Sequence, residues 1–179
     1  MSKEIVVIIG GPGSGKTTIV ERLVEKGYIC YPEISREITL EARSQGVEQL
    51  FLENPLLFSE LLLEGRKKQF NNALKEESDL IFLDRGIPDV LAYMHYIGDS
   101  YPSFFDKACK DHKYTKVFFL PPWEDIYTAD EARYENFEQA KLIAGHLAET
   151  YTSYGYNLIE VPKDTTDNRI LFILGQLSK

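Results

Sequence analysis

The sequence IVVIIGGPGSGKTT at residues 5–18 joins five β-branched residues to a glycine-rich turn. Residues 10–17 match the pattern G-x-x-x-x-G-K-[ST] at every fixed position, and the apolar run supplies the strand that must precede it. A dinucleotide-binding fingerprint, G-x-G-x-x-G, does not fit, because it would need glycine at Lys16 or Thr18. The stretch therefore predicts a P-loop: a buried strand, a phosphate-binding turn and a helix in succession.

The turn has the composition that a polyphosphate requires, since backbone N–H groups can surround phosphates closely only where side chains are absent. Gly11, Gly13 and Gly15 allow positive φ and close approach. The helix expected over Ser14–Glu25 would begin beneath the phosphates, so its free amides and the positive end of its dipole would face the anion. The predicted nucleotide-binding residues are Gly10, Gly11, Pro12, Gly13, Ser14, Gly15, Lys16, Thr17 and Thr18.

Two side chains of the turn have predicted roles of their own. Lys16 would bridge the β- and γ-phosphates as a point charge, and the hydroxyl of Thr17 would ligate Mg²⁺. ATP and Mg²⁺ are therefore the expected ligands, although the motif itself does not distinguish ATP from GTP.

Length and charge limit the classes of protein to consider. A chain of 179 residues can bury one sizeable core, so we expect a single domain over residues 1–179. The net charge of −8 argues against a nucleic-acid or anionic-membrane partner, whose usual mark is a basic patch. Cys30 and Cys109 lack C-x-x-C spacing, which is typical of a reduced cytoplasmic protein. The apolar runs are too short for a signal peptide or a membrane span.

Short apolar runs alternate with longer helical patterns, which is typical of a parallel sheet covered by helices on both faces. We therefore expect an α/β fold, a kinase-like P-loop NTPase three-layer sandwich with a five-stranded parallel sheet. The predicted strands are Glu4–Ile9, Tyr28–Tyr31, Asp79–Leu83, Lys116–Leu120 and Tyr156–Val161. The predicted helices are Ser14–Glu25, Pro32–Ser44, Pro55–Lys75, Pro88–Ile97, Pro102–Lys110, Glu131–Thr150 and Thr166–Leu177, and residues 48–55 fit either a mobile or an ordered segment.

Asp84 and Arg85 directly follow the third predicted strand, and ligands of open α/β sheets bind at the carboxyl ends of strands. The carboxylate of Asp84 could hold Mg²⁺ directly or through water, or could take a proton from an acceptor hydroxyl. Arg85 could clamp a phosphate with two hydrogen bonds. The alternative is that Asp84 only caps the next helix.

Glu33 follows the second predicted strand, and Arg36 and Arg43 share one face of the helix behind it. Glu33 is therefore a second candidate for the general base, and the arginines are candidates to bind an anionic substrate. The alternative is an acid favoured by the helix dipole, with two solvated arginines. The choice between Glu33 and Asp84 as the base stays open.

The polar stretch Glu124–Arg133 follows the fourth predicted strand and could close over the phosphates as a lid. Arg133 would then neutralise charge on the γ-phosphate during transfer, an effect worth ~10³ or more in rate where arginine plays that role. Arg133 could equally be an exposed helix residue paired with a nearby glutamate. Residues 162–165, after the fifth strand, lie at the same edge of the sheet and could contact the nucleotide base.

The histidines and tyrosines carry weaker signals. His95, His112 and His146 lack metal-ligand spacing, so surface or core roles are favoured over zinc binding. Tyr93 and the tyrosines that follow it are expected to pack in the core, and one of them could line a substrate pocket.

Four segments carry a resemblance to a known family. They are GGPGSGKTT at residues 10–18, YPEISRE at 31–37, FLDRGIPD at 82–89 and LPPWEDIY at 120–127, the last followed by Arg133. With these motifs the chain resembles compact P-loop proteins of the AAA-like or NadR-like ATPase and kinase group, which are similar to nicotinamide riboside kinases and deoxynucleoside kinases. The segments span most of the chain.

The resemblance implies roles for three residues. Glu33 would be the general base, with Asp84 and Arg85 at the metal and the phosphates. Gly86 departs from the deoxynucleoside kinase pattern, in which a serine follows the acid and the arginine. The chain is too short for the helical lid domain of hexameric AAA motors, and it lacks the N-K-x-D and D-x-x-G motifs of signalling GTPases.

Together these features predict a Mg²⁺-dependent phosphotransferase that moves the γ-phosphoryl group of ATP to a small nucleoside- or riboside-like metabolite. Glu33, Arg36 and Arg85 would bind that acceptor. The alternative is a nucleotide-gated binding module, in which ATP or GTP switches a surface for a protein or lipid partner. An inactive P-loop is more distant, because Lys16 and Thr17 are both intact. The acceptor and the oligomeric state stay open.

Overall fold

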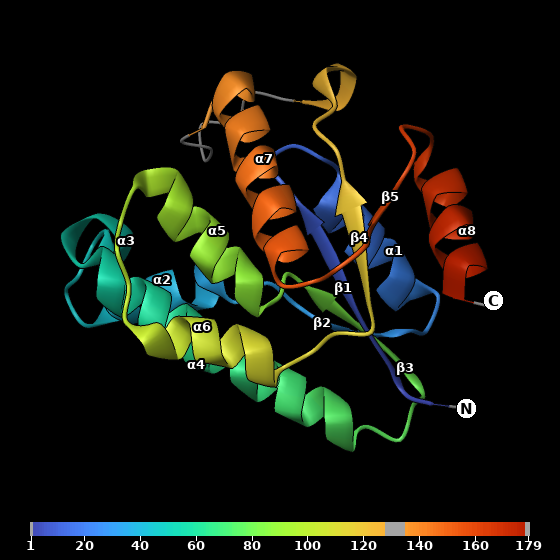
Figure 1. Ribbon diagram of the computed structural model, residues 1–179. Coiled ribbons are helices and arrows are strands. Elements are labelled where there is room, and N and C mark those ends of the chain that lie inside the picture. The colour runs from blue at the N-terminus through green and yellow to red at the C-terminus, as the bar shows by residue number, and fades with distance from the viewer. Residues whose placement is uncertain (1, 128–134, 178–179) are drawn as a thin grey trace.

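The fold is built on a five-stranded parallel sheet with helices on both faces, as the sequence predicts (Figure 1). The computed structural model describes residues 2–127 and 135–177. The strand order is β2-β3-β1-β4-β5. The strands are β1 (Glu4–Gly10), β2 (Ile29–Tyr31), β3 (Leu80–Asp84), β4 (Lys116–Leu120) and β5 (Leu158–Glu160).

Helices fill the connections between the strands. The helices are α1 (Lys16–Glu25), α2 (Ser35–Ser44), α3 (Leu50–Glu53), α4 (Pro55–Lys75), α5 (Ile87–Ile97), α6 (Ser103–Asp111), α7 (Phe137–Ser153) and α8 (Thr166–Leu177). A 3₁₀ turn at Glu124–Ile126 follows β4. Residues 48–55, which the sequence left undecided, contain the short helix α3, and this helix buries Leu50.

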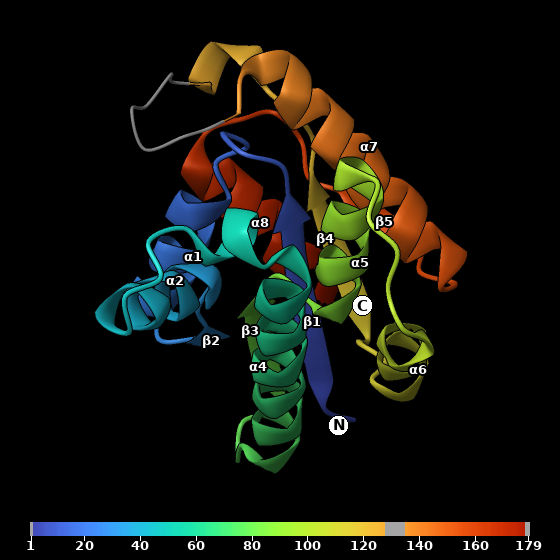
Figure 2. The ribbon, with the colours of Figure 1, turned by 90° about the vertical axis from the view of Figure 1, so that its left-hand side faces the viewer.

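β1 lies at the centre of the sheet, and its alternating side chains enter two layers of the core. Ile5, Val7 and Ile9 pack with residues of α4, α5 and α7, whereas Val6 and Ile8 pack with residues of α1 and α8. Figure 2 shows the sheet between these two groups of helices. The three-layer sandwich is thus confirmed, and the even and odd residues of one strand define its two interfaces.

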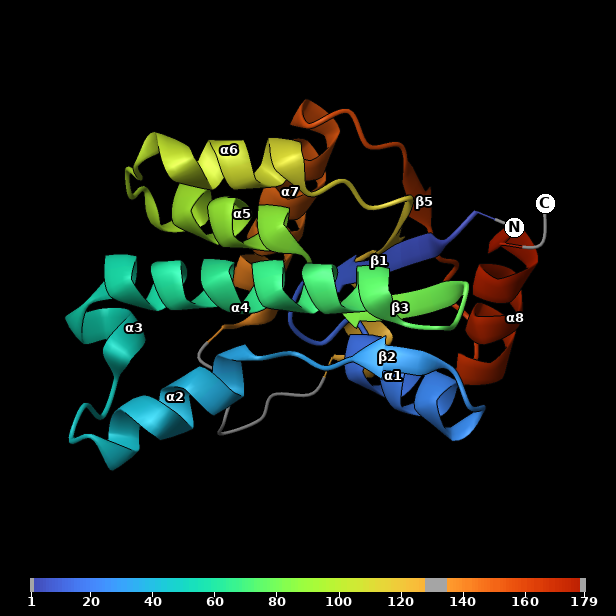
Figure 3. The same ribbon diagram turned by 90° about the horizontal axis from the view of Figure 1, so that it is seen from below.

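A separate cluster of buried side chains lies beyond the sheet. Residues of α2, α3 and the first half of α4, among them Phe58 and Leu62, pack there with residues of α5 and α6, among them Leu91 and Phe105. Figure 3 shows α2, α3 and the beginning of α4 extending past the sheet. This cluster holds α2 and α4 in place as one wall of the site described below.

The helices α1 and α7 begin later than expected for local reasons. α1 begins at Lys16 because Gly15 has φ 86° and is not helical. α7 begins at Phe137, where the side chain of Asn136 accepts a hydrogen bond from the Gln139 amide. The prediction of helix from Glu131 is therefore wrong for residues 135 and 136, and residues 131–134 lie outside the described part of the chain.

Within residues 2–127 and 135–177, no helix is long and apolar enough to cross a membrane. Both cysteines are free thiols; Cys109 is buried and Cys30 is half-buried. Burial raises the pKa of each thiol to about 12, so neither is a thiolate at neutral pH.

Candidate active site

The P-loop connects the carboxyl end of β1 to α1. Gly13 and Gly15 have φ values of 72° and 86°, a region that glycine enters without strain. Gly11 is required for a different reason, because a Cβ atom there would lie 2.8 Å from the carbonyl oxygen of Ala140 in α7. Glycine at this position therefore allows α7 to pack directly against the turn.

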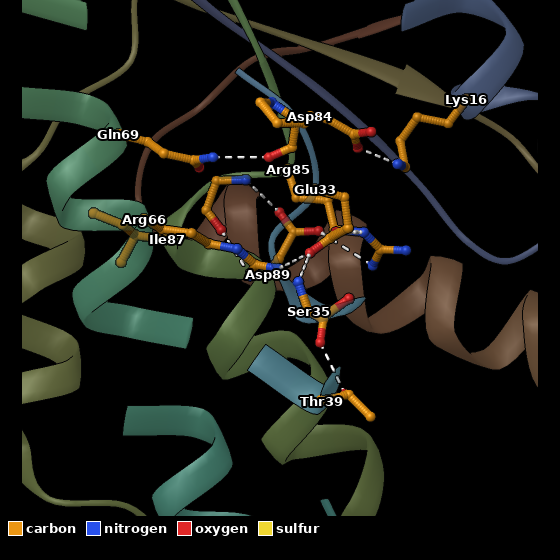
Figure 4. A network of polar contacts seen from close by, with 12 residues as sticks. Lys16, Glu33, Ser35, Thr39, Arg66, Gln69, Asp84, Arg85, Ile87 and Asp89 are labelled. Carbon is orange, nitrogen blue, oxygen red and sulfur yellow. Dashed lines mark hydrogen bonds and ion pairs between the residues drawn. The ribbon is translucent and has the colours of Figure 1, made fainter. Parts of the chain in front are cut away.

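Lys16 and Asp84 meet beside the P-loop (Figure 4). The pairing of β1 with β3 sets Ile8 opposite Asp84, which places this carboxylate next to the start of the turn. Lys16 Nζ donates a hydrogen bond to Asp84 Oδ1, and both side chains are buried. Burial and the charge of Arg85 lower the pKa of Lys16, while Asp84 opposes the shift. Asp84 thus contacts the P-loop lysine through its side chain.

A cavity of about 750 Å³ opens over the P-loop. Thr17 and Thr18 are exposed and line it together with the other residues of the turn. Residues 164–166 form a further part of its wall, in agreement with the position expected for the loop after β5. Trp123 and Ile126, in and beside the 3₁₀ turn after β4, complete this side. The volume lies in the range of small-molecule sites.

Arg169 of α8 also lines this cavity, and sequence reasoning gave it no role. Its Nη1 donates a hydrogen bond of 3.1 Å to the carbonyl oxygen of Ser14, and its guanidinium carbon lies 5.5 Å from the centre of the Trp123 ring. Its Nε and Nη2 are buried and have no hydrogen-bond partner among the described residues. One sequence signal existed: Arg169 lies one turn before the buried Ile173, so it interrupts the apolar face of its helix.

The register of the sheet brings Glu33 and Arg85 together. Tyr31 of β2 pairs with Leu83 of β3, and Glu33 and Arg85 each follow two residues later. Glu33 Oε2 and Arg85 Nε form an ion pair, which Figure 4 shows at the centre of a wider polar network. Two segments that are far apart in the sequence therefore meet at one edge of the sheet.

Glu33 is held on its other side by α2 and α4. Its Oε1 accepts hydrogen bonds from the Ser35 amide at 2.9 Å and from Arg66 Nη2 at 3.2 Å. The first of these bonds satisfies the free amide of the first residue of α2, which begins at Ser35 and not at Pro32 as expected. Burial alone would raise the pKa of Glu33, but the charges of Arg85 and Arg66 and the amide bond lower it to about 2. Glu33 is therefore ionised at neutral pH.

Arg85 has an unusual backbone conformation for a residue with a side chain. Its φ is 73°, and its amide donates a hydrogen bond of 3.1 Å to the carbonyl oxygen of Ile8 in β1. Such a conformation costs on the order of 1 kcal/mol or more and is typical of functional sites. It directs the guanidinium of Arg85 toward Glu33, while Asp89 Oδ1 lies 3.9 Å from Arg85 Nη1.

The structure explains the glycine that follows Arg85. A Cβ atom on Gly86 would lie 2.6 Å from the hydroxyl oxygen of Tyr151 and 2.9 Å from a ring carbon of Tyr114. The serine found here in the deoxynucleoside kinase pattern therefore has no room. The carbonyl oxygen of Gly86 accepts a hydrogen bond of 3.2 Å from Arg66 Nη1, which gives this buried arginine a second fixed contact.

A second cavity, of about 670 Å³, lies between α2, α4 and α5. Its wall includes Glu33, Arg85 and Asp89, together with Phe51 and Phe58. The P-loop cavity and this second cavity share three residues, which mark the boundary between them: Arg85, Tyr93 and Glu135. Tyr93 is thus a tyrosine that lines a pocket, as the sequence allowed.

The remaining sequence candidates fall into three groups. Arg36 and Arg43 line the second cavity but are exposed, and Arg43 Nε donates a hydrogen bond of 3.0 Å to the carbonyl oxygen of Glu48. His95 contacts Thr150 and Tyr101 by hydrogen bonds, and among the described residues there is no group of three or more histidine, cysteine or acidic side chains that could hold a metal. Arg133 lies outside the described residues.

Comparison with known proteins agrees with this architecture. A family model described as an AAA domain matches residues 5–169. No curated protein matches the chain.

Several solved structures have the same fold. A deoxyadenosine kinase from M. mycoides, with dCMP and dCDP bound, superposes with a TM-score of 0.72 at 19% identity over 97% of this chain and 98% of the kinase. The NadR protein in complex with NR gives a TM-score of 0.75 at 16% identity over 98% of this chain and 50% of NadR. A thymidylate kinase from Ehrlichia chaffeensis gives 0.64 at 16% identity, with 99% of each chain covered. At these identities the likeness establishes the fold.

Proposed function

The chain belongs to this family of AAA domains, and we propose that it is a kinase that transfers the γ-phosphoryl group of ATP to a hydroxyl group of a small nucleoside- or riboside-like acceptor. One observation carries the proposal: the P-loop cavity and the second cavity meet at Arg85. A phosphate donor in one cavity and an acceptor in the other would face each other across this arginine. Such positioning of two reactants is a main source of rate enhancement.

The donor would lie in the P-loop cavity. Backbone amides of the turn and the N-terminus of α1 suit the phosphates, and Lys16 would exchange Asp84 for the β- and γ-phosphates. Thr17 and Asp84 offer a hydroxyl and a carboxylate, which are ligand types that Mg²⁺ takes, and the carboxylate of Asp84 already holds the Lys16 ammonium as a cation. A bound Mg²⁺ would neutralise charge on the transferred group.

The acceptor would lie in the second cavity with its hydroxyl group at Glu33. The acceptor oxygen attacks the γ-phosphorus, the bond to the leaving ADP oxygen breaks, and the hydroxyl proton passes to Glu33 or to the phosphoryl oxygens. A carboxylate with a pKa of about 2 is a weak base, so its main work is to orient the hydroxyl. Orientation of the hydroxyl is sufficient if the transition state is loose and the hydroxyl proton is transferred only after most of the phosphoryl transfer has occurred.

The charges at this end of the second cavity favour a hydroxyl acceptor over a phosphate acceptor. The carboxylates of Glu33 and Asp89 balance the guanidinium groups of Arg66 and Arg85, so an added phosphate would meet no surplus of positive charge. The same cavity also supports a transferase over a nucleotide-gated binding module, because a module of that kind needs no second small-molecule site beside the γ-phosphate.

The test is a screen of nucleosides and ribosides for acceptor-dependent ADP release, with Lys16→Ala as the background control. Mass spectrometry of the product would locate the added phosphate. We expect at least one acceptor to raise ADP release well above the rate in its absence, in the wild type alone. If the wild type binds Mg·ATP but no acceptor in either class raises ADP release, the proposed transfer is wrong.

A further inference from the structure

Asp89 is a buried carboxylate in the first turn of α5, at the inner end of the second cavity. Its side chain is 2% exposed. Its Oδ2 accepts two hydrogen bonds, one of 3.0 Å from the Gly86 amide and one from the hydroxyl of Tyr151. Burial raises the pKa of Tyr151 well above its usual value, so this hydroxyl keeps its proton and remains a donor.

The second oxygen of Asp89 is different. Within the described part of the chain, Oδ1 is buried and receives no hydrogen bond. The nearest charged group, Arg85 Nη1, lies 3.9 Å away, which is too far for a hydrogen bond, and Arg85 is ion-paired through Nε with Glu33. Buried carboxylate oxygens nearly always have a donor, because an unsatisfied one costs about 1–3 kcal/mol or more.

The missing donor can come from the contents of the cavity. A phosphate oxygen carries no proton to donate and would be repelled by the carboxylate, whereas a hydroxyl group can donate. Glu33 contacts the same arginine and is the group proposed to bind the hydroxyl that is phosphorylated (Figure 4). Two carboxylates beside one arginine are suited to a sugar that presents two hydroxyl groups.

We propose that Asp89 determines acceptor specificity by accepting a hydrogen bond from a second ring hydroxyl of the acceptor, beside the phosphorylated position. The inference rests on the proposed kinase function and narrows its substrate class to ribose-type sugars. A deoxy sugar that lacks this hydroxyl would leave Asp89 Oδ1 unsatisfied. A site built to hydrogen-bond a hydroxyl rejects the analogue without it far more strongly than an apolar pocket rejects a missing methylene.

The experiment uses calorimetry on the full chain with Mg·AMP-PNP bound. The ligands are adenosine, guanosine, cytidine and uridine, each with its 2′-deoxy and 3′-deoxy forms. For wild type we expect at least one ribonucleoside to bind about 10-fold or more tightly than one of its deoxy forms. Asp89→Asn keeps a carbonyl oxygen for the Gly86 amide and Tyr151 but places an NH₂ group at the position of Oδ1, so the ratio should fall to within about twofold.

Two controls separate specificity from folding. Asp99→Asn changes an exposed carboxylate just beyond the same helix and should keep the wild-type ratio. Thermal melts show whether Asp89→Asn folds. If this variant does not fold, the ratio of ribonucleoside to deoxynucleoside affinity in the wild type still tests the inference. Binding of nucleosides without discrimination between ribo and deoxy forms, or discrimination that survives in Asp89→Asn, would overturn this inference alone. If no nucleoside binds, the acceptor class of the proposed function fails as well.

Discussion

The two cavities that meet at Arg85 are lined by different kinds of groups. One side of the P-loop cavity is a continuous stretch of the chain, residues 11–18, which includes one buried lysine. The second cavity is lined by side chains from α2, α4 and α5 and from the loops that precede α2 and α5, and Glu33 is ion-paired there with Arg66 and Arg85. The backbone amides of the turn can bind an anion without breaking an existing ion pair. Glu33 and Arg85, in contrast, must weaken their ion pair before either can bind a ligand.

This difference predicts that substitutions in the two cavities have different effects on activity and stability. Damage to the P-loop cavity should abolish chemistry with every acceptor. Damage to the second cavity should change which acceptor is used, or how stable the protein is, while the donor still binds. The following experiments test that contrast in order of decreasing effect.

Lys16→Ala should have the largest effect. Removal of the charge that would bridge the β- and γ-phosphates should lower kcat by roughly 10³-fold with any acceptor, by analogy with other groups that stabilise the transferred phosphoryl. The measurement is steady-state ADP formation, with circular dichroism to verify the fold. A variant that keeps more than a tenth of wild-type turnover would contradict the role proposed for Lys16.

Glu33→Gln should act on the acceptor side only. The amide is isosteric but uncharged, so we expect phosphoryl transfer to fall about 10²-fold while the Kd for Mg·ATP stays within about twofold. Calorimetry gives the Kd and a coupled assay gives kcat. Loss of nucleotide affinity on the same scale as the loss of turnover would show that the two cavities are not separable in this way.

Gly86→Ser restores the serine of the deoxynucleoside kinase pattern but should destabilise this protein. The new Cβ would press on Tyr151 and Tyr114, and overpacking of this kind costs roughly 1–3 kcal/mol. Urea unfolding measures the loss. The matched control is Gly145→Ser, at an exposed position of α7 with open space around it, where we expect little change. Equal stability of the two variants would refute the steric explanation.

The ion pairs of Glu33 should make stability depend on pH. Its folded pKa, about 2, lies below its usual value of 4.5. The ionised group therefore stabilises the fold above about pH 4.5, and this stabilisation is lost as the pH falls toward 2, with a loss of about 2 kcal/mol by pH 3. Urea unfolding of wild type and Glu33→Gln at pH 6, 4.5 and 3 isolates the contribution. Parallel pH profiles for the two proteins would argue against it.

The same contrast explains which parts of the fold and the site could be predicted from the sequence. The P-loop is a local pattern, and so residues 10–18, the strand before them and the helix after them could be predicted from one segment. Asp84 and Glu33 were found because both follow apolar strands, and parallel strands end at one edge of the sheet. The residues without a predicted role, Asp89 and Arg169, act through contacts with distant segments, Tyr151 and Ser14.

The helix boundaries could not all be predicted, because they too depend on contacts between distant segments. The start of α2 at Ser35 depends on a carboxylate that also binds Arg66 of α4, a contact between positions 33 residues apart. Gly86 was recognised as a departure from a pattern, but its cause lies in Tyr151 of α7, which no local signal links to it. Side-chain networks that join separate elements set these details, and periodicity carries no information about them.

The close approach of Ala140 to Gly11 has a mechanical consequence. At one end, the backbone of α7 lies against the P-loop turn, and near its other end Tyr151 donates a hydrogen bond to Asp89 of the second cavity. One helix therefore contacts the walls of both cavities. Because α7 contacts both the P-loop turn and Asp89, we expect a tilt of this helix to shift the two proposed subsites together.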